Sequence, residues 1–475
     1  MEQIKADICV IGAGAGGLVV SAGASQMGAS VVLFEKAEMG GDCLNVGCVP
    51  SKALLSAAHA AHGVETASLY GVEAAAPTIN WSNVQAHVKK AIKTIEPVDS
   101  VERYEGFGVR VIQAEAKFIG PRQVEGGGVQ VEAKYVVIAT GSVPAVPPIP
   151  GLEKVPYLTN ETIFELPERP EHLLVLGGGP IGAELAQAHR RLGCKVTLVE
   201  AASILGVEDR DAAEVVRQSL LKDGVEVKEG AKAICVDQSD EGGIRLSLET
   251  ASGEEMVEGS HLLVAVGRRV GFDGLDVEKA GVALDERGRL KLDPRLRTSN
   301  KRVFAVGDAA GGAQFTHLAA YHASIVIRNT LFWLPAKADH SQLTRVTYTA
   351  PEVASVGKSE AQLKQEGAAF EVLRWNYEEN DRAILEDDKE GFAKLFVTPK
   401  GHILGSAIVG TNAGELLSLV ALAMAKKLKV GDLAALMVPY PTRMEVVRRA
   451  ASSWYGPKLF TERTRKIVRF LMRFA

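Results

Sequence analysis

The chain has 475 residues, of which 47% are hydrophobic and 24% charged, so it can bury several cores and is expected to divide into about three domains. Its formal net charge of −4 offers no bulk electrostatic attraction for nucleic acid, which is therefore not expected as a partner. Five cysteines in a chain of this length exclude a secreted disulfide scaffold and favour a reducing cytoplasm.

The chain begins with a predicted strand–helix–strand unit that carries a glycine fingerprint. An apolar run at residues 7–11 leads into G-x-G-x-x-G, whose glycines are Gly12, Gly14 and Gly17, and a small-residue helix and a second strand follow. Such glycines permit a tight turn, the close approach of a pyrophosphate and helix–strand packing. Glu35, at the end of the second strand, is placed to bind a ribose hydroxyl. The unit predicts a dinucleotide site.

Two cysteines follow in a glycine-rich segment, MGGDCLNVGCVPSKALL. A regular helix would separate the Cα atoms of Cys43 and Cys48 by about 7.5 Å of rise, beyond the roughly 7 Å that a disulfide tolerates. We therefore expect a distorted turn, with Gly47 supplying backbone freedom and Pro50 at a position that a first helical turn accepts. Amides at the start of the helix would favour a thiolate. A redox pair is the preferred interpretation, against two unlinked thiols or a metal clip.

The segment after the cysteine helix is predicted to hold an amphipathic helical stretch and several strands. The helical stretch is residues 80–103, and the strands are residues 109–118, 129–131 and 135–139. The last strand ends in Thr140, Gly141 and Ser142, a turn suited to the edge of a cofactor. A proline-dense crossing at residues 144–150 then indicates a domain boundary.

A second strand–helix–strand unit with the same fingerprint lies at residues 172–200. Its glycines and terminal acid, spaced as in the first unit, are Gly177, Gly179, Gly182 and Glu200. Two such units imply two dinucleotides, and the chemistry between a flavin and a nicotinamide is hydride transfer. Glu200 would accept a hydrogen bond from a ribose 2′-hydroxyl and repel a 2′-phosphate, which favours NADH. Arg190, Arg191 and Lys195 lie close enough in sequence to keep NADPH open.

Two later strands also end in residues that suit a cofactor edge. Residues 262–267 finish at Gly267, and residues 303–306 run into Gly307 and Asp308. The alternative for Asp308 is an ordinary helix N-cap. Thr316 opens a further helix, whose positive end could face the electron-accepting edge of a flavin.

The pattern changes at residue 345, where β-rich segments mix with helices at residues 359–365 and 414–427. This predicts a separate α+β domain. Residues 459–475 then read as a basic amphipathic helix. Its apolar stripe is Phe460, Thr464, Ile467, Val468, Leu471 and Phe474, and its basic residues are Arg463, Lys466, Arg469 and Arg473. The stripe could pack on its own subunit or a partner subunit, or attach the protein to an anionic membrane.

The chain resembles the class I flavoprotein pyridine nucleotide-disulfide oxidoreductases, the group of dihydrolipoyl dehydrogenase, glutathione reductase and mercuric reductase. The motifs that carry the resemblance are GGDCLNVGCVPSK, GGGPIGAE, ATGSVP, VFAVGDAAG and VTYTAPEVASVG. It implies an α/β fold with two Rossmann-like dinucleotide-binding domains, for FAD and NAD, and an α+β C-terminal dimerisation domain. The implied segments are 1–150 and 271–344 for FAD, 151–270 for NAD(P), 345–457 for dimerisation and 458–475 for the basic amphipathic C-terminal helix.

The same resemblance implies roles for individual residues. FAD lies along the first unit with Glu35 and Asp308 on its hydroxyls, and NAD(P)H binds the second unit. Cys48 adjoins the flavin and Cys43 meets the substrate. Lys52 pairs with Glu184 at the site of hydride transfer, where ordinary surface charges are the alternative. Further expected cofactor residues are Lys36, Gly41, Asp42, Lys52, Thr140, Gly141, Ser142, Gly267 and Thr316. Members of the group are homodimers in which the last domain of one subunit completes the other's site.

Three positions depart from the family pattern. Asp42 replaces the usual Thr before the first cysteine, and its charge could disfavour a Cys43 thiolate. Pro180 stands where relatives often carry a gating Tyr. In the motif VPYPTRME, Tyr440 replaces the His of thiol-handling members while Glu445 is retained. A tyrosine titrates near ~10 and is a poor base for a dithiol at neutral pH.

The Tyr440 substitution makes the motif similar to mercuric reductases, although those enzymes generally end in a vicinal cysteine pair and no cysteine follows Cys235 here. The predicted function is transfer of hydride from NAD(P)H to FAD and of electrons to Cys43–Cys48, then to a small thiol, disulfide or metal-ion acceptor. Dihydrolipoyl dehydrogenase is the alternative enzyme, and a flavin-bound binding protein without turnover is the alternative class. No resident metal is expected, and the expected location is cytoplasmic; peripheral membrane contact through the C-terminal helix is the alternative to packing of that helix on a subunit.

Overall fold

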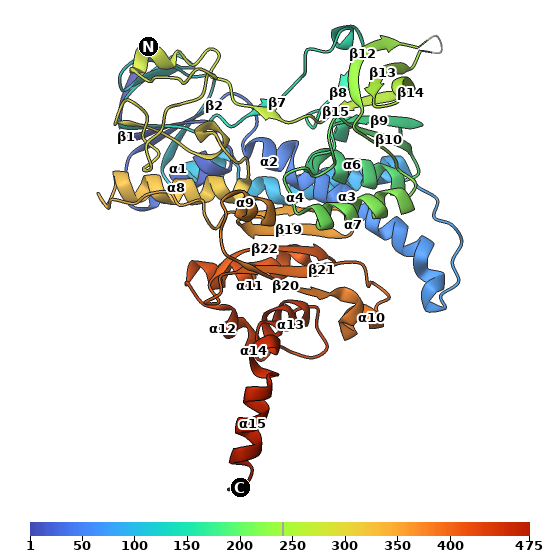
Figure 1. Ribbon diagram of the computed structural model, residues 1–475. Helices are drawn as coiled ribbons and strands as arrows, with labels where there is room; N and C mark the ends of the chain where they lie inside the picture. Colours follow the sequence, from blue (N-terminus) through green and yellow to red (C-terminus); the bar gives the residue numbers. More distant parts are fainter. Residues whose placement is uncertain (240–241) are drawn as a thin grey trace.

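The computed structural model describes residues 1–239 and 242–475. Two domains, each built around a set of parallel strands, lie side by side, and a third domain lies against both of them (Figure 1). The C-terminal helix projects from the third domain and points away from the rest of the molecule. This is the mixed α/β architecture with an α+β last domain that the sequence predicts.

The first domain is built on a seven-stranded sheet in which β3, β2, β1, β6, β5 and β4 lie in that order and β17 pairs with β6. The strands are β1 (Glu2–Ile11), β2 (Val31–Glu35), β3 (Val109–Gln113), β4 (Lys117–Gly120), β5 (Gln123–Gly126), β6 (Val129–Ile138) and β17 (Val303–Ala305). The two separate strands predicted within residues 129–139 are one strand, because β1 extends back to Glu2 and pairs with β6 along its whole length.

Helices from distant parts of the chain belong to this domain. They are α1 (Ala15–Gln26), α2 (Gly41–Asn45), α3 (Cys48–Thr66), α4 (Trp81–Ile95), α5 (Val101–Gly106) and α8 (Thr316–Thr330). α1 and α5 contact its sheet, whereas α3 packs against α4 and against α6 (Pro180–Arg191) of the second domain. α1 contacts α8, and Leu18 and Val326 share one buried core with Ile8 and Val10 of β1. The first domain is therefore completed only by residues that follow the second domain.

The second domain is a parallel sheet in the order β11, β10, β9, β15 and β8, with an antiparallel sheet of β12, β13 and β14. Its strands are β8 (Tyr157–Leu158), β9 (His172–Leu176), β10 (Lys195–Glu200), β11 (Glu226–Glu229), β12 (Lys232–Gln238), β13 (Ile244–Thr250), β14 (Gly253–Gly259) and β15 (His261–Val264), and its helices are α6 (Pro180–Arg191) and α7 (Arg210–Lys222). A ribbon of β7 (Val143–Pro144) and β16 (Arg268–Arg269) connects the two domains.

The third domain has an antiparallel sheet in the order β18, β19, β22, β21 and β20. The strands are β18 (Thr344–Thr347), β19 (Glu352–Gly357), β20 (Glu371–Asn376), β21 (Phe392–Val397) and β22 (Ile403–Gly410), and the helices are α9 (Glu360–Gln365), α10 (Asp381–Leu385), α11 (Ala413–Ala425), α12 (Val430–Ala434) and α13 (Glu445–Ser453). Ala354, Leu395 and Ile408 of the sheet and Val420 of α11 are buried in one core, while Val353 and Phe392 are buried in the core that includes the second domain.

The predicted single helix over residues 458–475 is two helices. α14 (Gly456–Leu459) ends before Phe460, and α15 (Glu462–Leu471) starts after the N-cap Thr461, whose side-chain oxygen accepts a hydrogen bond from the Thr464 N–H. The break was not predicted because the apolar spacing continues through Phe460, and an N-cap residue does not alter a helical periodicity.

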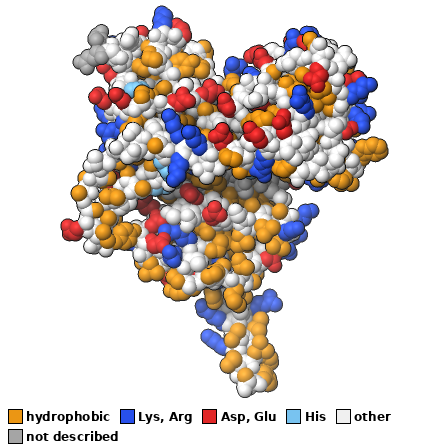
Figure 2. Space-filling view, turned by 180° about the vertical axis from the view of Figure 1, so that it is seen from behind, with side chains coloured by type: hydrophobic (Ala, Val, Ile, Leu, Met, Phe, Trp, Pro, Cys, Tyr) orange, Lys and Arg blue, Asp and Glu red, His pale blue; other side chains and the backbone are white. Residues whose placement is uncertain are grey.

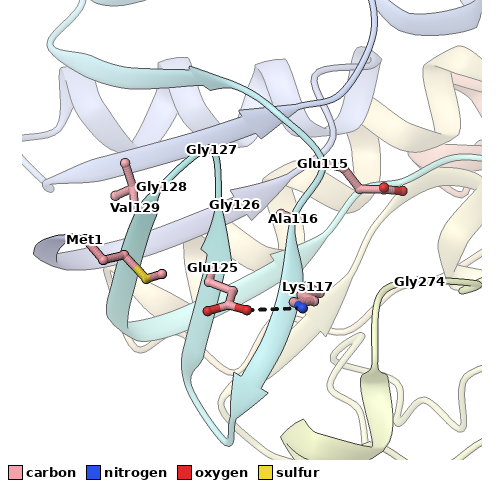
Figure 3. Close-up of a pocket in the computed structure, with 10 residues that line it drawn as sticks. All are labelled: Met1, Glu115, Ala116, Lys117, Glu125, Gly126, Gly127, Gly128, Val129 and Gly274. Carbon is pink, nitrogen blue, oxygen red and sulfur yellow. Dashed lines mark ion pairs between the residues drawn. The ribbon is translucent and has the colours of Figure 1, made fainter.

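A hollow of about 340 Å³ lies at the edge of the first domain (Figure 3). β4 and β5 line it, and Lys117 and Glu125 form an ion pair across it at 3.2 Å. Glu115, which also lines the hollow, has a carboxylate oxygen 3.8 Å from the ammonium of Lys36. This contact places the hollow beside the end of β2, whereas both thiols are absent from its lining.

Candidate functional site

The two thiols lie on either side of a break between two helices. α2 ends at Asn45 and α3 begins at Cys48, so the distortion predicted for this turn is confirmed. Gly47 between them has φ −129° and ψ −113°, and a Cβ there would lie 2.7 Å from the carbonyl oxygen of Asp42. No side chain fits at that distance, so glycine is required for the chain to fold back between the cysteines.

The thiols polarise each other. A hydrogen bond between them raises the pKa of Cys43, with burial adding to the rise. The same bond, together with the Thr316 hydroxyl and the Lys52 ammonium, lowers the pKa of Cys48 to about 6 against the opposing effects of burial and of the Glu184 charge. The Sγ of Cys48 is 3.4 Å from Oγ1 of Thr316 at the start of α8. At neutral pH the pair therefore holds its charge on Cys48, while Cys43 carries the proton.

A partly buried ion pair lies beside Cys48. Nζ of Lys52 on α3 donates to Oε2 of Glu184 on α6 at 2.7 Å, and the Glu184 side chain is only 6% exposed. The backbone N–H of Tyr348 donates to the other oxygen of Glu184 at 2.9 Å, and its ring centroid is 4.4 Å from Nζ of Lys52. All three domains thus meet at this pair. The quoted motif VTYTAPEVASVG contains Tyr348, but its role was missed because the contact joins distant segments.

A second network surrounds Asp42. The guanidinium of Arg268 donates to Asp42 and, at 2.7 Å, to Oγ of Ser142. The hydroxyl of Ser142 donates to Asp308 at 2.6 Å, and burial raises the pKa of Asp308. Arg268 offsets the charge of Asp42, which reduces the expected repulsion of a Cys43 thiolate. Sequence reasoning missed Arg268, although it directly follows the predicted Gly267.

Both nucleotide units hold their terminal acids in the same way. The carboxylate of Glu35 accepts hydrogen bonds from the N–H of Ala13 at 2.6 Å and of Ala37 at 2.8 Å. Glu200 accepts from the N–H of Gly178 at 2.7 Å and of Ala202 at 2.9 Å. Each acid is thereby fixed against its own glycine turn, with lone pairs left over for a ribose hydroxyl.

The glycine turns themselves are equally close-packed. A Cβ at Gly17 would lie 1.9 Å from the carbonyl oxygen of Gly12, and a Cβ at Gly182 would lie 1.9 Å from that of Gly177. The N-caps of α1 and α6 are glycines without side-chain hydrogen bonds, and neither helix has an acid in its first turn. These helix ends therefore fit the phosphates of dinucleotides.

The remaining predicted cofactor residues lie around these turns. A Cβ at Gly41 would come within 2.8 Å of Cα of Gly14, which fixes the cysteine loop against the first glycine turn. Thr140 and Gly141 follow β6 and lead to Ser142, and Gly267 directly precedes β16.

Tyr440 and Glu445 lie on the third domain. Tyr440 is 70% exposed, and its hydroxyl donates to Oδ2 of Asp381 at 2.9 Å, a contact that raises the pKa of the tyrosine. Glu445, at the start of α13, is buried and has an oxygen 3.4 Å from a guanidinium nitrogen of Arg448. Asp381 was not predicted, since nothing in its local sequence distinguishes it from an ordinary first-turn acid of α10.

Comparison of the sequence with known protein families finds two family models that match most of the chain. The family model for pyridine nucleotide-disulphide oxidoreductases matches residues 6–323, and the model for the dimerisation domain of these enzymes matches residues 343–451. A mercuric reductase of Streptomyces lividans is 35% identical over 455 residues, covering 94% of this chain and 96% of the relative. A dihydrolipoyl dehydrogenase of Staphylococcus aureus is 34% identical over 466 residues, covering 96% and 98%.

A solved structure is similar as well. It is the Cu(II) complex of the HOCl-induced flavoprotein disulfide reductase RclA from Escherichia coli, with a TM-score of 0.83 and 26% identity over 93% of this chain and 98% of that one.

Proposed function

The chain belongs to the pyridine nucleotide-disulphide oxidoreductase family, and from that premise we propose that it carries electrons from NAD(P)H through FAD to Cys43 and Cys48, and from them to a thiol-reactive acceptor. Membership makes it an oxidoreductase of an FAD-dependent family that uses NAD(P)H, and its dimerisation domain supports a homodimer. The observation that carries the proposal is the polarised thiol pair, with the Lys52–Glu184 ion pair next to it.

The residues present fit two dinucleotides. FAD would be held by Gly12, Gly14 and Gly17 at the start of α1, by Glu35, and by the linked Ser142 and Asp308. The start of α6 and Glu200 would hold NAD(P)H in the same manner. When bound, FAD supplies a two-electron relay between a nicotinamide and a disulfide.

The chain's own groups then manage charge and protons. Two electrons break the Cys43–Cys48 bond, after which Cys48 keeps a thiolate and Cys43 takes up one proton. The opposite pKa shifts of the two thiols support this assignment. Lys52 keeps positive charge beside Cys48, and Glu184 fixes the position of the ammonium.

We propose NADH as the preferred nicotinamide. Glu200 at the end of β10 would repel a 2′-phosphate. The neighbouring cations have other partners: Arg190 donates to the carbonyl of Gly224 at 3.1 Å, and Arg191 pairs with Asp223 at 2.7 Å. Because both arginines are engaged by other groups, these contacts argue against the alternative in which the arginines select NADPH.

The acceptor we propose is a metal ion or small disulfide, as for mercuric reductase, with lipoamide as the second candidate. The exposed Tyr440 and its bond to Asp381 support this choice, because a phenol with a raised pKa stays protonated at neutral pH and cannot accept a proton from a dithiol. A dihydrolipoyl dehydrogenase relative of similar identity keeps the second candidate in view.

Anaerobic NADH titration followed by an acceptor screen tests the proposal. We expect a long-wavelength thiolate–flavin absorbance band, then turnover with Hg(II) or a small disulfide that exceeds turnover with lipoamide and quinones. Tyr440→His is expected to raise dihydrolipoamide oxidation severalfold, because it restores an imidazole base. A flavin that NADH cannot reduce would instead favour a binding protein without turnover. High wild-type activity with lipoamide would favour dihydrolipoyl dehydrogenase.

We also propose a cytoplasmic location. All five cysteines, each within the described residues, are unpaired, which suits a reducing compartment where a single dithiol can cycle.

A further inference from the structure

α15 stands apart from the body of the protein. No residue of Glu462–Leu471 is buried, and the helix extends from the third domain into solvent (Figure 1). Residues 452–475 also lie beyond both matched family models. Neither packing within the subunit nor the family's shared architecture therefore accounts for this helix.

The side chains of this tail segregate by type. At about 100° per residue, one face carries the apolar side chains and the opposite face carries cations. The apolar face consists of Ile467, Val468, Phe470 and Leu471, continued by Met472 and Phe474 just after the helix, each at least 50% exposed; Phe460, also exposed, precedes the helix. Figure 2 shows hydrophobic side chains along the tail. Phe470 and Phe474 contact each other, with ring centroids 5.2 Å apart, so the face is continuous at its end.

The cations carry the argument for one kind of surface. Arg465, Lys466, Arg469 and Arg473 lie opposite the apolar face, and Arg463 lies at its edge. Glu462 is the only acid in residues 460–475, and it pairs with Arg465 at 2.9 Å. An anionic lipid surface offers both complements together, phosphates for the cations and acyl chains for the apolar face.

Crossing a bilayer is excluded for this helix. Ten residues span about 15 Å, half of a hydrocarbon core. None of the helices in residues 1–239 and 242–475 is long and apolar enough to cross a membrane. A ten-residue amphipathic helix with no buried residue is instead suited to lie along a surface.

We propose that α15 binds reversibly to anionic lipid surfaces, with its apolar face among the acyl chains and its cations among the headgroup phosphates. In a homodimer two copies of α15 are present, so weak contacts add through effective concentration. This proposal does not depend on the electron acceptor.

Co-sedimentation of the full-length holoenzyme with vesicles tests it. The probes are phosphatidylcholine vesicles with and without about one third phosphatidylglycerol, at low and high salt. We expect binding to the anionic vesicles at low salt and at least about tenfold weaker binding to neutral vesicles or at high salt.

Paired variants separate the two faces. Arg465→Glu/Arg469→Glu/Arg473→Glu and, separately, Ile467→Asp/Leu471→Asp are each expected to weaken binding by at least about tenfold. Lys89→Glu/Lys90→Glu/Lys93→Glu on α4 changes the net charge equally at exposed positions and is expected to bind as the wild type does.

Two results would overturn the proposal. One is equal sedimentation of the wild type and both α15 variants. The other is a chain truncated after Phe460 that loses its dimeric state while the full chain ignores anionic vesicles, which would make α15 a contact between subunits. Retained NADH-dependent flavin reduction verifies folding in every variant.

Discussion

The two nucleotide units have the same turn but different helices. Gly17 and Gly182 approach a carbonyl oxygen equally closely, and Glu35 and Glu200 accept the same pair of backbone bonds. α1, in contrast, carries no charged residue, and it packs against α8. α6 packs against α3, the helix of Cys48, and places Glu184 within reach of Lys52.

Corresponding positions make the difference concrete. Two residues after the last fingerprint glycine, α1 has Val19, which is 40% exposed, and α6 has Glu184, which is 4% exposed. The shared fingerprint therefore specifies the geometry of each turn, while the following helix determines which side chain reaches the thiol pair. Only the helix of the second unit supplies a side chain, Glu184, to the proposed mechanism.

The largest expected effect comes from removing the thiolate that α3 presents. Cys48→Ser is expected to retain FAD and to lose disulfide reduction by at least about a thousandfold, because serine cannot accept electrons from the flavin side. Steady-state NADH oxidation with a disulfide acceptor measures it. Cys235→Ser, on β12 of the second domain, is the matched control and should keep full activity. Disulfide reduction by Cys48→Ser at the wild-type rate would exclude the Cys48 thiolate from the mechanism.

The next prediction tests whether α1 and α6 differ in their contribution to flavin reduction. Glu184→Gln keeps an acceptor for the Tyr348 N–H but leaves Lys52 without a counter-charge. Stopped-flow reduction of the flavin by NADH is expected to slow by about ten- to a hundredfold. Val19→Thr, a change of similar size on α1, should leave that rate unaltered. Equal rates for the two variants would mean that Glu184 on α6 contributes no more to flavin reduction than Val19 on α1 does.

The third prediction concerns the terminal acid that each nucleotide unit carries, and it tests whether each acid acts on its own dinucleotide. Glu200→Ala is expected to lower the ratio of kcat/KM for NADH over NADPH by about tenfold, because the acid no longer repels a 2′-phosphate. Glu35→Ala should weaken FAD retention and leave that ratio unchanged. A wild-type preference for NADPH would contradict the role given to Glu200.

The smallest effect at neutral pH concerns Lys52. The lowered pKa of Cys48, about 6, means that its thiolate forms above that pH and is protonated below it, so the long-wavelength band of the reduced enzyme should fade on acidification. Lys52→Met removes a cation that lowers this pKa and leaves Glu184 uncompensated, so both changes raise it. We expect the midpoint to move up by about one pH unit. An unmoved midpoint would contradict the contribution of the Lys52 charge to this pKa.

Local rules explain what the sequence predicted. Glycine spacing, the terminal acids and the interrupted cysteine turn depend on residues near one another in the chain, and each is present in the structure. The Lys52–Glu184 contact came from the family resemblance, since 132 positions separate its members.

The contacts that were missed span still longer separations. Arg268 meets Asp42 across 226 positions, and Tyr348 meets Glu184 across 164. No periodicity encodes such pairs, because they depend on how whole domains pack. The break before α15 was missed for the opposite reason, since an N-cap bond spans too few residues to alter a helical pattern.

The late closure of the first domain has a consequence for biosynthesis. β17 pairs with β6, and α8 packs on α1, so the sheet that emerges first from a ribosome lacks a strand and a helix until about residue 330 is made. The second domain is continuous in sequence and can fold while the first waits. Fragments ending at residue 299 should therefore protect the second domain from protease but not the first, whereas fragments ending at residue 344 should protect both.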